Sequence, residues 1–238
     1  MKAIRLKIHQ ETANYRLPFD YDLRESLPLP PYSTVIGMIH NLCGYTNYHP
    51  MQLSIQGTYD STTSNLQTRY EFGVIDKRAL SIQIISQNNG EKQVQRIIRG
   101  IMHVQLLNNV NLLIHVVPSN QDFATIYNAL KKPKNYPSLG RYEDLASMQV
   151  DTTDLKEKQL NEDMSIQNGF YVPINKVNEL RLQGVYYNLP KQYEHLTAKN
   201  YSIREWIEKV PTYYVSSLTV NAGQTLMQDD NNNVVFLG

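Results

Sequence analysis

The stretch SLPLPPYSTVIGMIHNLCG, residues Ser26–Gly44, decides how the N-terminal half of the chain folds. Its prolines hold the approach extended, and a proline in the first turn of a helix wastes no backbone donor. Apolar side chains then recur at helical spacing on one face: Val35, Met38, Ile39 and Leu42. The stretch therefore predicts an amphipathic helix that ends at Cys43. Ser33 or Thr34 is the expected cap, and Gly44 suits the left-handed stop.

The segments on either side of this helix have the pattern of strands. Residues 2–9 alternate apolar and charged side chains, which is typical of a strand with one buried face. Residues 51–59 alternate again, and the polar residues 60–68 indicate the start of an excursion. Further along, two β-prone runs flank Gln-Asn-Asn-Gly at residues 87–90. This pattern predicts a protruding hairpin around Asn89.

The order of elements predicts the fold class. A long β-prone segment ends at Pro118, and residues 121–132 have apolar side chains at helical spacing. With a further strand near residues 145–150, the order is βαββαβ, the ferredoxin-like topology. We therefore expect an α+β protein with a ferredoxin-like (RRM-like) N-terminal domain over residues 1–150, which carries a β-hairpin insertion at about 60–102. Residues 151–238 are expected to form a linker and a small all-β C-terminal subdomain.

Composition limits the possible partners and compartments. The chain has 23 basic and 22 acidic residues, so a polyanionic partner must be met by a local patch. A single cysteine excludes an internal disulfide framework, and residues 1–10 lack the apolar run of a secretory signal. No stretch is apolar enough for a membrane helix. We expect a cytoplasmic protein with no membrane partner.

Several classes of chemistry lack the residues they need. His40 and Cys43 lie three residues apart, but one cysteine does not make a structural zinc site, so no metal is predicted. Phosphate-binding glycine loops and nucleophile elbows are both absent from the sequence. No catalytic residue and no cofactor is therefore predicted. Metal-free RNA cleavage needs only an acid, a base and a cation. His115 in LLIHVV is the candidate catalytic residue for it, and the alternative is that His115 is a structural residue of the core or of the sheet surface.

The middle of the chain favours nucleic acid. Between residues 51 and 140, basic side chains outnumber acidic ones and are interleaved with tyrosines, including Tyr59, Tyr70 and Tyr127. A ferredoxin-like sheet with an arm is a common RNA-binding platform. The aromatic signature of RRM domains is missing, so this pattern alone does not identify the ligand.

Four motifs occur in order along the chain: YRLPF at 15–19, the opening stretch at 26–44, QLSIQGTY at 52–59 and YPSLGRYEDLA at 136–146. On these residues the sequence resembles the Cas-five family of the RAMP superfamily in type I CRISPR Cascade complexes, and is most similar to type I-B members. The likeness is strongest over residues 1–150 and continues more loosely to the C-terminus.

The resemblance implies a non-catalytic subunit for antiviral defence that binds the 5′ handle of the guide RNA (crRNA). It also implies Cascade backbone and large subunits as partners, target DNA nearby, and a thumb, the inserted hairpin, pressed between guide and target. Motif by motif, it suggests these residues for RNA contact: Arg16, Tyr32, Ser33, Thr34, Arg69, Lys92, Arg96, Arg99 and Arg141.

The residues leave open two site assignments and three functions: RNA binding, RNA cleavage and protein binding alone. Ser33 either helps a helix N-terminus to receive phosphate or only caps it, and Arg141 is either an RNA contact or an ion-pair partner of Glu143 or Asp144. Type I-C members look like endoribonucleases that process precursor crRNA with Tyr, Lys and His. Here Ile114, not lysine, precedes His115, so that constellation is not assembled. A scaffold that binds only protein is the third possibility.

Overall fold

A computed structural model describes residues 1–17, 23–72, 81–88, 91–180, 182–198 and 201–238, with the side chains of 71–98, 178, 197–198 and 201–202 left out of the description. The elements, in chain order, are β1 (Lys2–Ala13), α1 (Tyr32–Cys43), β2 (Met51–Thr58), β3 (Ser61–Phe72), β4 (Ser81–Asn88), β5 (Glu91–Pro118), α2 (Phe123–Lys131), β6 (Ser147–Asp154), β7 (Lys156–Gln159), β8 (Met164–Ile166), β9 (Gly169–Pro173), α3 (Ile174–Leu180), β10 (Val185–Ala198), β11 (Tyr201–Val215), β12 (Leu218–Val220) and β13 (Thr225–Gln228).

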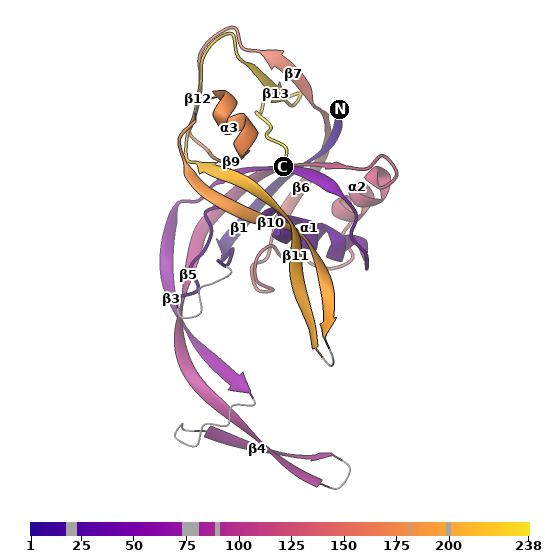
Figure 1. Cartoon of the computed structure of the whole chain (residues 1–238), viewed down its shortest axis with the longest axis vertical. Helices are drawn as coiled ribbons and strands as arrows, with labels where there is room; N and C mark the ends of the chain where they lie inside the picture. The colour runs from indigo at the N-terminus through magenta and orange to yellow at the C-terminus, as the bar shows by residue number, and fades with distance from the viewer. Residues whose placement is uncertain (18–22, 73–80, 89–90, 181, 199–200) are drawn as a thin grey trace.

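Four neighbouring strands of a nine-stranded sheet lie in the order β2-β5-β1-β6, with β6 at one edge. Helix α1 connects β1 to β2, and helix α2 connects β5 to β6. The two helices contact each other and lie on one side of the sheet (Figure 1). All the strand pairings described are antiparallel, so the molecule has a mixed α/β fold built mainly on an antiparallel sheet. The strand predicted near residues 145–150 is present as β6.

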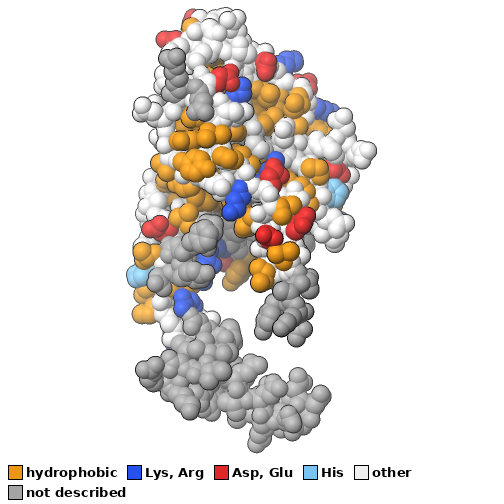
Figure 2. Space-filling model, in the orientation of Figure 1, with side chains coloured by type: hydrophobic (Ala, Val, Ile, Leu, Met, Phe, Trp, Pro, Cys, Tyr) orange, Lys and Arg blue, Asp and Glu red, His pale blue; other side chains and the backbone are white. Residues whose placement is uncertain are grey.

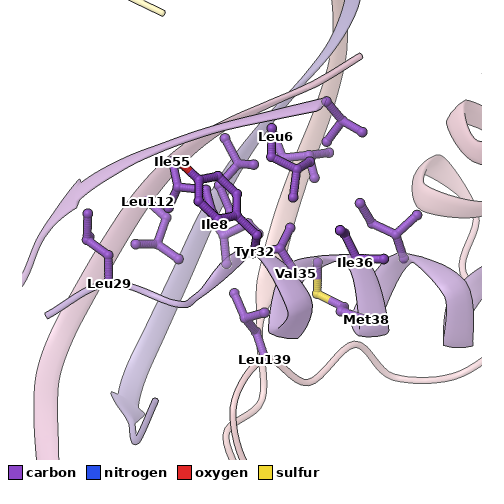
Figure 3. Close-up of a cluster of buried hydrophobic side chains, with 14 of the residues drawn as sticks. Leu6, Ile8, Leu29, Tyr32, Val35, Ile36, Met38, Ile55, Leu112 and Leu139 are labelled. Atoms are coloured by element: carbon purple, nitrogen blue, oxygen red, sulfur yellow. The ribbon is translucent and has the colours of Figure 1, made fainter. Parts of the chain in front are cut away.

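The main core lies between this sheet and helix α1. In β1, Ile4, Leu6 and Ile8 are buried on the helix side, which confirms the predicted alternation. The apolar face predicted for α1 is also buried, and Figure 3 shows Val35 of that face beside Ile8 of β1. Burial of this apolar surface is the main force that holds the helix on the sheet.

The predicted cap of α1 is wrong. The N-cap residue is Pro31, and no side chain caps the helix. Its carbonyl instead accepts hydrogen bonds from the N–H groups of Thr34 (3.0 Å) and Val35 (3.3 Å). The predicted stop is confirmed, because Gly44 takes the left-handed conformation with φ of 72°.

Strand β5 is long enough to belong to both the sheet and a protruding arm. Its C-terminal part pairs with β1 and β2, and its N-terminal part pairs with β3 and β4. Asn109, with φ of 51°, lies where the neighbour of β5 changes from β2 to β3. The arm extends away from the helices and sheet (Figure 1). Strand β4 pairs with β5 up to Asn88 and Glu91, while the Asn-Gly turn predicted at residues 89–90 lies outside the described residues.

The C-terminal part continues the same sheet. Strand β9 pairs with β2, β11 pairs with β9, and β10 pairs with β11 to form a long hairpin. Two small two-stranded sheets, β8 with β12 and β7 with β13, flank a second core that contains Phe170 and Phe236. Among the described residues, no helix is long and apolar enough to cross a membrane.

The C-terminal segment covers the sheet face that the helices leave open. Here Asp229 is fully buried, and its Oδ2 lies 3.1 Å from His115 Nε2 on β5 and 3.4 Å from an Arg5 guanidinium nitrogen on β1. Backbone and side-chain N–H groups of Asn233 donate to the same carboxylate. Burial lowers the pKa of His115 more than Asp229 raises it. We call this buried group the Asp229 anchor, defined as Arg5, His115, Asp229 and Asn233.

We predict that Asp229→Ala lowers the free energy of unfolding by about 3 to 5 kcal/mol, because it leaves His115 buried without its acceptor and leaves Arg5 with only the exposed Asp151. The measurement is chemical denaturation at pH 7. Glu162→Gln, at an exposed acid, is the control and should leave the stability unchanged. An equal effect of both substitutions would contradict the role of the anchor.

The same anchor predicts acid sensitivity. Burial alone would raise the pKa of Asp229, but hydrogen bonds from Asn233 and His115 outweigh it and hold the pKa at about 2. An aspartate in the unfolded chain has a pKa of about 3.9. The stabilisation is therefore complete above that pH and is lost as the pH falls toward about 2. Asp229→Asn should remove this part of the pH dependence, as measured by unfolding between those pH values.

Candidate nucleic-acid interface

Four arginines gather where the arm leaves the sheet: Arg16, Arg24, Arg69 and Arg141. The pKa of the half-buried Arg24 is lowered, first by burial and then by the positive charges of the other three. Its Nε is buried without a hydrogen-bond partner among the described residues. Like charges held together in this way favour a bound anion. We call these four residues the arginine cluster.

Polar side chains hold the cluster's backbone in place. The Asn14 amide donates to the carbonyl of Arg24 (2.9 Å) and to the carbonyl of Gln105 on β5 (2.7 Å). The Gln105 side chain in turn accepts a hydrogen bond from the Ser26 N–H (2.9 Å). Asn14 is buried, so these bonds are protected from water. The chain around Arg24 is therefore fixed to β5, close to Arg69 on β3.

Arg141 makes ion pairs within its own loop. Its guanidinium lies 2.6 Å from Asp144, which is fully buried, and 2.9 Å from Glu143. Burial acts to lower the pKa of Arg141, but the hydrogen bond and charge of Asp144 outweigh it and raise the pKa. Asp144 also accepts hydrogen bonds from the backbone N–H groups of Asn14 and Arg141. The structure thus shows the ion-pair alternative for Arg141, and the loop is tied to the end of β1.

The first turn of α1 lies next to the cluster. Ser33 and Thr34 are half-buried and line a groove that Arg16 also lines. The N–H groups of Thr34 and Val35 donate to the Pro31 carbonyl, whereas those of Tyr32 and Ser33 have no intrahelical acceptor and carry a partial positive charge. No acidic side chain occupies this turn to compete for them. The turn can therefore receive an anionic group such as phosphate.

Tyr32 must be removed from the set of RNA contacts. Its side chain is 0% exposed and belongs to the core, where Figure 3 shows it among apolar side chains. Its ring lies 6.3 Å from that of Tyr171. Burial raises the pKa of Tyr32 to about 12. A ring in this position cannot stack on a base without opening the core, so Tyr32 is a packing residue.

The groove runs between helix α1 and the β10–β11 hairpin and has a volume of about 1340 Å³. Helix α1 and the loop after it form one side, including His40 and Tyr48. The hairpin forms the other side through residues 187–195 of β10 and through Arg204 and Trp206 of β11. Figure 1 shows the hairpin passing in front of α1 and extending beyond it. A groove of this volume can accept several residues or nucleotides of an extended chain.

The hairpin side of the groove is aromatic and cationic. The ring of Tyr193 lies 5.6 Å from the ring of Trp206, edge to face, and the guanidinium of Arg204 lies 4.8 Å above Tyr193. His195 packs against the other side of this group, with its ring 5.3 Å from that of Tyr193. Aromatic rings and arginine planes are the surfaces on which unpaired bases stack. We call these four residues the aromatic wall.

The sequence predictions missed the aromatic wall. Tyr193 and His195 are two residues apart on β10, and Arg204 and Trp206 are two apart on β11. The register pairs Tyr193 with Trp206 and His195 with Arg204, so all four side chains lie on one face. The period-2 spacing on both strands was the available signal, but it indicates a shared face only once the hairpin register is known.

The arm carries the other predicted cations. Arg69 on β3 is opposite Gly100 on β5, and the exposed Arg99 is opposite Tyr70. Lys92 and Arg96 lie on the first part of β5, but their side chains lie outside the described residues. Basic side chains are visible at the base of the arm in Figure 2, next to the residues drawn in grey. The arm's described cations therefore continue the arginine cluster outward.

His115 is not placed for chemistry on a ligand. It is 0% exposed and belongs to the Asp229 anchor on the opposite side of the sheet from α1. Burial lowers its pKa, so it is held as a neutral structural side chain. A general base must reach the proton that it takes, and this one is covered by the C-terminal segment.

A smaller hollow, of about 440 Å³, lies on the helix-free face of the sheet. Lys7, His9 and Asn111 are among its lining residues, and His9 Nδ1 lies 3.0 Å from the Asn111 side-chain oxygen. Its lining includes no tyrosine, tryptophan or phenylalanine. It can meet a polar or anionic surface but offers little for base stacking, so the α1 groove is the better nucleic-acid site.

One comparison with known proteins identifies a family. A family model described as "CRISPR-associated protein (Cas_Cas5)" matches residues 3–213. Among solved structures, one described as "CRISPR RNA-guided surveillance complex" is similar with a TM-score of 0.49 and 13% identity, over 93% of this chain and 91% of that chain. Another, described as a CRISPR protein from Archaeoglobus fulgidus, has a TM-score of 0.45 and 9% identity, over 100% and 99% of the two chains. None of the curated proteins matches the sequence.

We predict that Trp206→Ala weakens binding of single-stranded RNA by the isolated chain. Loss of one stacked base costs about 1–3 kcal/mol, which is roughly 5- to 150-fold in Kd. Ile207→Ala is the matched control, because Ile207 is the next residue on the opposite face of the hairpin. Fluorescence anisotropy measures both variants, and equal Kd values for Trp206→Ala and the unaltered chain would remove the aromatic wall from the site.

Proposed function

This chain belongs to the CRISPR-associated Cas_Cas5 family, and from that premise we propose that it is a non-catalytic RNA-binding subunit of a type I CRISPR surveillance complex. Its ligand in this proposal is the 5′ handle of the guide RNA. We assign it to subtype I-B on the sequence motifs, with the cytoplasm as its location. Its protein partners are then the backbone and large subunits of the complex, with target DNA nearby.

The arginine cluster is the observation that carries the proposal. The net charge of the whole chain is only +1, so general attraction cannot account for RNA binding. Yet the pKa of Arg24, lowered first by burial, is lowered further by the charges of Arg16, Arg69 and Arg141 from three distant segments, and Glu143 offsets this only in part. Arg141 is itself paired with Glu143 and Asp144, so Arg16, Arg24 and Arg69 are the main cations of the site. A phosphate placed among them would relieve this repulsion and release bound counterions.

The form of the groove favours single-stranded RNA over an RNA duplex as the ligand. Arg16 belongs both to the cluster and to the groove lining, so the two parts are continuous. One phosphate would lie at the cluster and the next at the first turn of α1, beside Ser33 and Thr34. The bases would then reach the aromatic wall, where Tyr193 and Trp206 offer stacking surfaces.

The finer description of the fold belongs to the same proposal. We interpret the strand order β2-β5-β1-β6 with helices α1 and α2 as a ferredoxin-like domain over residues 1–150. The arm of β3, β4 and the first part of β5 is then the thumb, which would press between guide and target. Its cations Arg69, Lys92, Arg96 and Arg99 would track phosphates. Residues 151–238 would form the C-terminal subdomain, although β9 pairs with β2 of the central sheet.

Salt dependence tests the cluster. We expect Arg24→Ala, Arg69→Ala and Arg99→Ala each to weaken binding of RNA regardless of its sequence, and to lower the slope of log K against log salt by about one for each phosphate that is no longer neutralised. Lys156→Ala, at an exposed site on β7, should leave affinity and slope unchanged. If the cluster variants behave like the Lys156 variant, RNA is not held there.

A cleavage assay separates the proposal from an endoribonuclease. Labelled repeat RNA is incubated with the purified chain in EDTA, and retention and cleavage are followed together, with His115→Ala beside it. We expect retained, intact RNA from both proteins, because His115 is buried in the anchor. Cleavage at one site that is lost in the variant would make the protein a ribonuclease. If the chain does not retain the RNA, the remaining hypothesis is a scaffold that binds only protein.

A further inference from the structure

The β10–β11 hairpin has a second face, turned away from α1, that is apolar and exposed. Four large side chains on it are each at least half exposed: Tyr186 (50%), Leu196 (51%), Ile203 (61%) and Ile207 (50%). Leu196 and Ile203 are directly opposite each other in the register. Figure 2 shows hydrophobic side chains gathered where β9, β10 and β11 meet, with further ones along the hairpin. Exposed apolar side chains in such a row indicate a surface that is covered in the working state.

The same face carries an uncompensated pair of carboxylates. Glu194 and Glu205 are exposed and lie directly opposite each other across the two strands, and Glu194 also borders the α1 groove. Neither has an ion-pair partner among the residues that the structure describes. Like charges directly opposite each other weaken a hairpin, so an outside cation placed between them would be bound favourably. The exposed Lys209 is four residues further along β11.

We propose that this outer face docks a protein partner that presents a lysine or arginine among apolar side chains. The cation would lie between Glu194 and Glu205, and the apolar groups would cover Leu196, Ile203 and Ile207. The hairpin would then hold RNA on its inner face, by the aromatic wall, and protein on its outer face.

Charge selects this occupant over two others. RNA phosphates would face the two carboxylates, which repel them. A second copy of the chain would bring two more carboxylates and only one more lysine, so four carboxylates would face two lysines across the contact. A partner with an excess of cations satisfies both the charge and the apolar surface.

Photo-crosslinking in the assembled complex identifies what covers the face. A photoreactive p-benzoylphenylalanine is placed at position 207, and in a control at position 176 on α3, within a complex purified with its guide RNA. We expect a crosslink from position 207 to one other subunit, at a peptide that contains lysine or arginine, and none at that peptide from position 176. A crosslink to RNA, to a second copy or to nothing would overturn the proposal.

Charge exchange then tests the carboxylates. Glu194→Gln combined with Glu205→Gln should weaken association of this chain with the rest of the complex roughly tenfold, whereas the exposed-site control Glu157→Gln should not. Glu205→Lys should be rescued when the crosslinked partner cation is changed to glutamate; lack of rescue would overturn the pairing. RNA affinity of the isolated chain is measured in parallel, so a failure of the docking face is distinguishable from a failure of RNA binding.

Discussion

The arrangement of the molecule depends on the backbone pairing of β5, one 28-residue strand that serves both the sheet and the arm. Its hydrogen-bonding edges are used by β1 and β2 in one part and by β3 and β4 in the other. Because β5 runs unbroken from one part to the other, the arm continues the sheet through one strand. Gln105 lies near this junction and fixes the segment of Arg24 to β5, and Arg69 on β3 pairs with the same strand at Gly100. Strand β5 therefore carries two parts of the arginine cluster.

The sheet also separates structural from functional chemistry. On the helix-free face, the ionisable side chains of the Asp229 anchor are buried, and their contacts hold the C-terminal segment on the sheet. On the helix side, cations and aromatic rings remain accessible along the groove. The groups that most resemble an acid–base site are thus the buried ones, and the accessible groups are suited to binding.

Patterns within short stretches of sequence predicted the strands and helices, but they did not predict contacts between distant residues. The alternation of β1 and the apolar face of α1 are visible in sequence because each depends on neighbours within a few residues. The burial of Tyr32 and the pairing of His115 with Asp229, 114 residues away, depend on how distant segments meet. Arg24 belongs to no motif, and only the fold shows it among other arginines. The face shared by Tyr193 and Trp206 follows from a register with an irregularity near residues 190–193, which alternation alone does not reveal.

The central claim is that a guide RNA strand passes from the arginine cluster into the groove between α1 and the hairpin. Crosslinking of a complex assembled with 4-thiouridine-substituted guide RNA, followed by mass spectrometry of the crosslinked peptides, tests it most directly. The account predicts crosslinks from handle nucleotides to the peptides that contain Tyr193 and Trp206. Crosslinks confined to the helix-free face of the sheet, near Lys7 and His9, would contradict it.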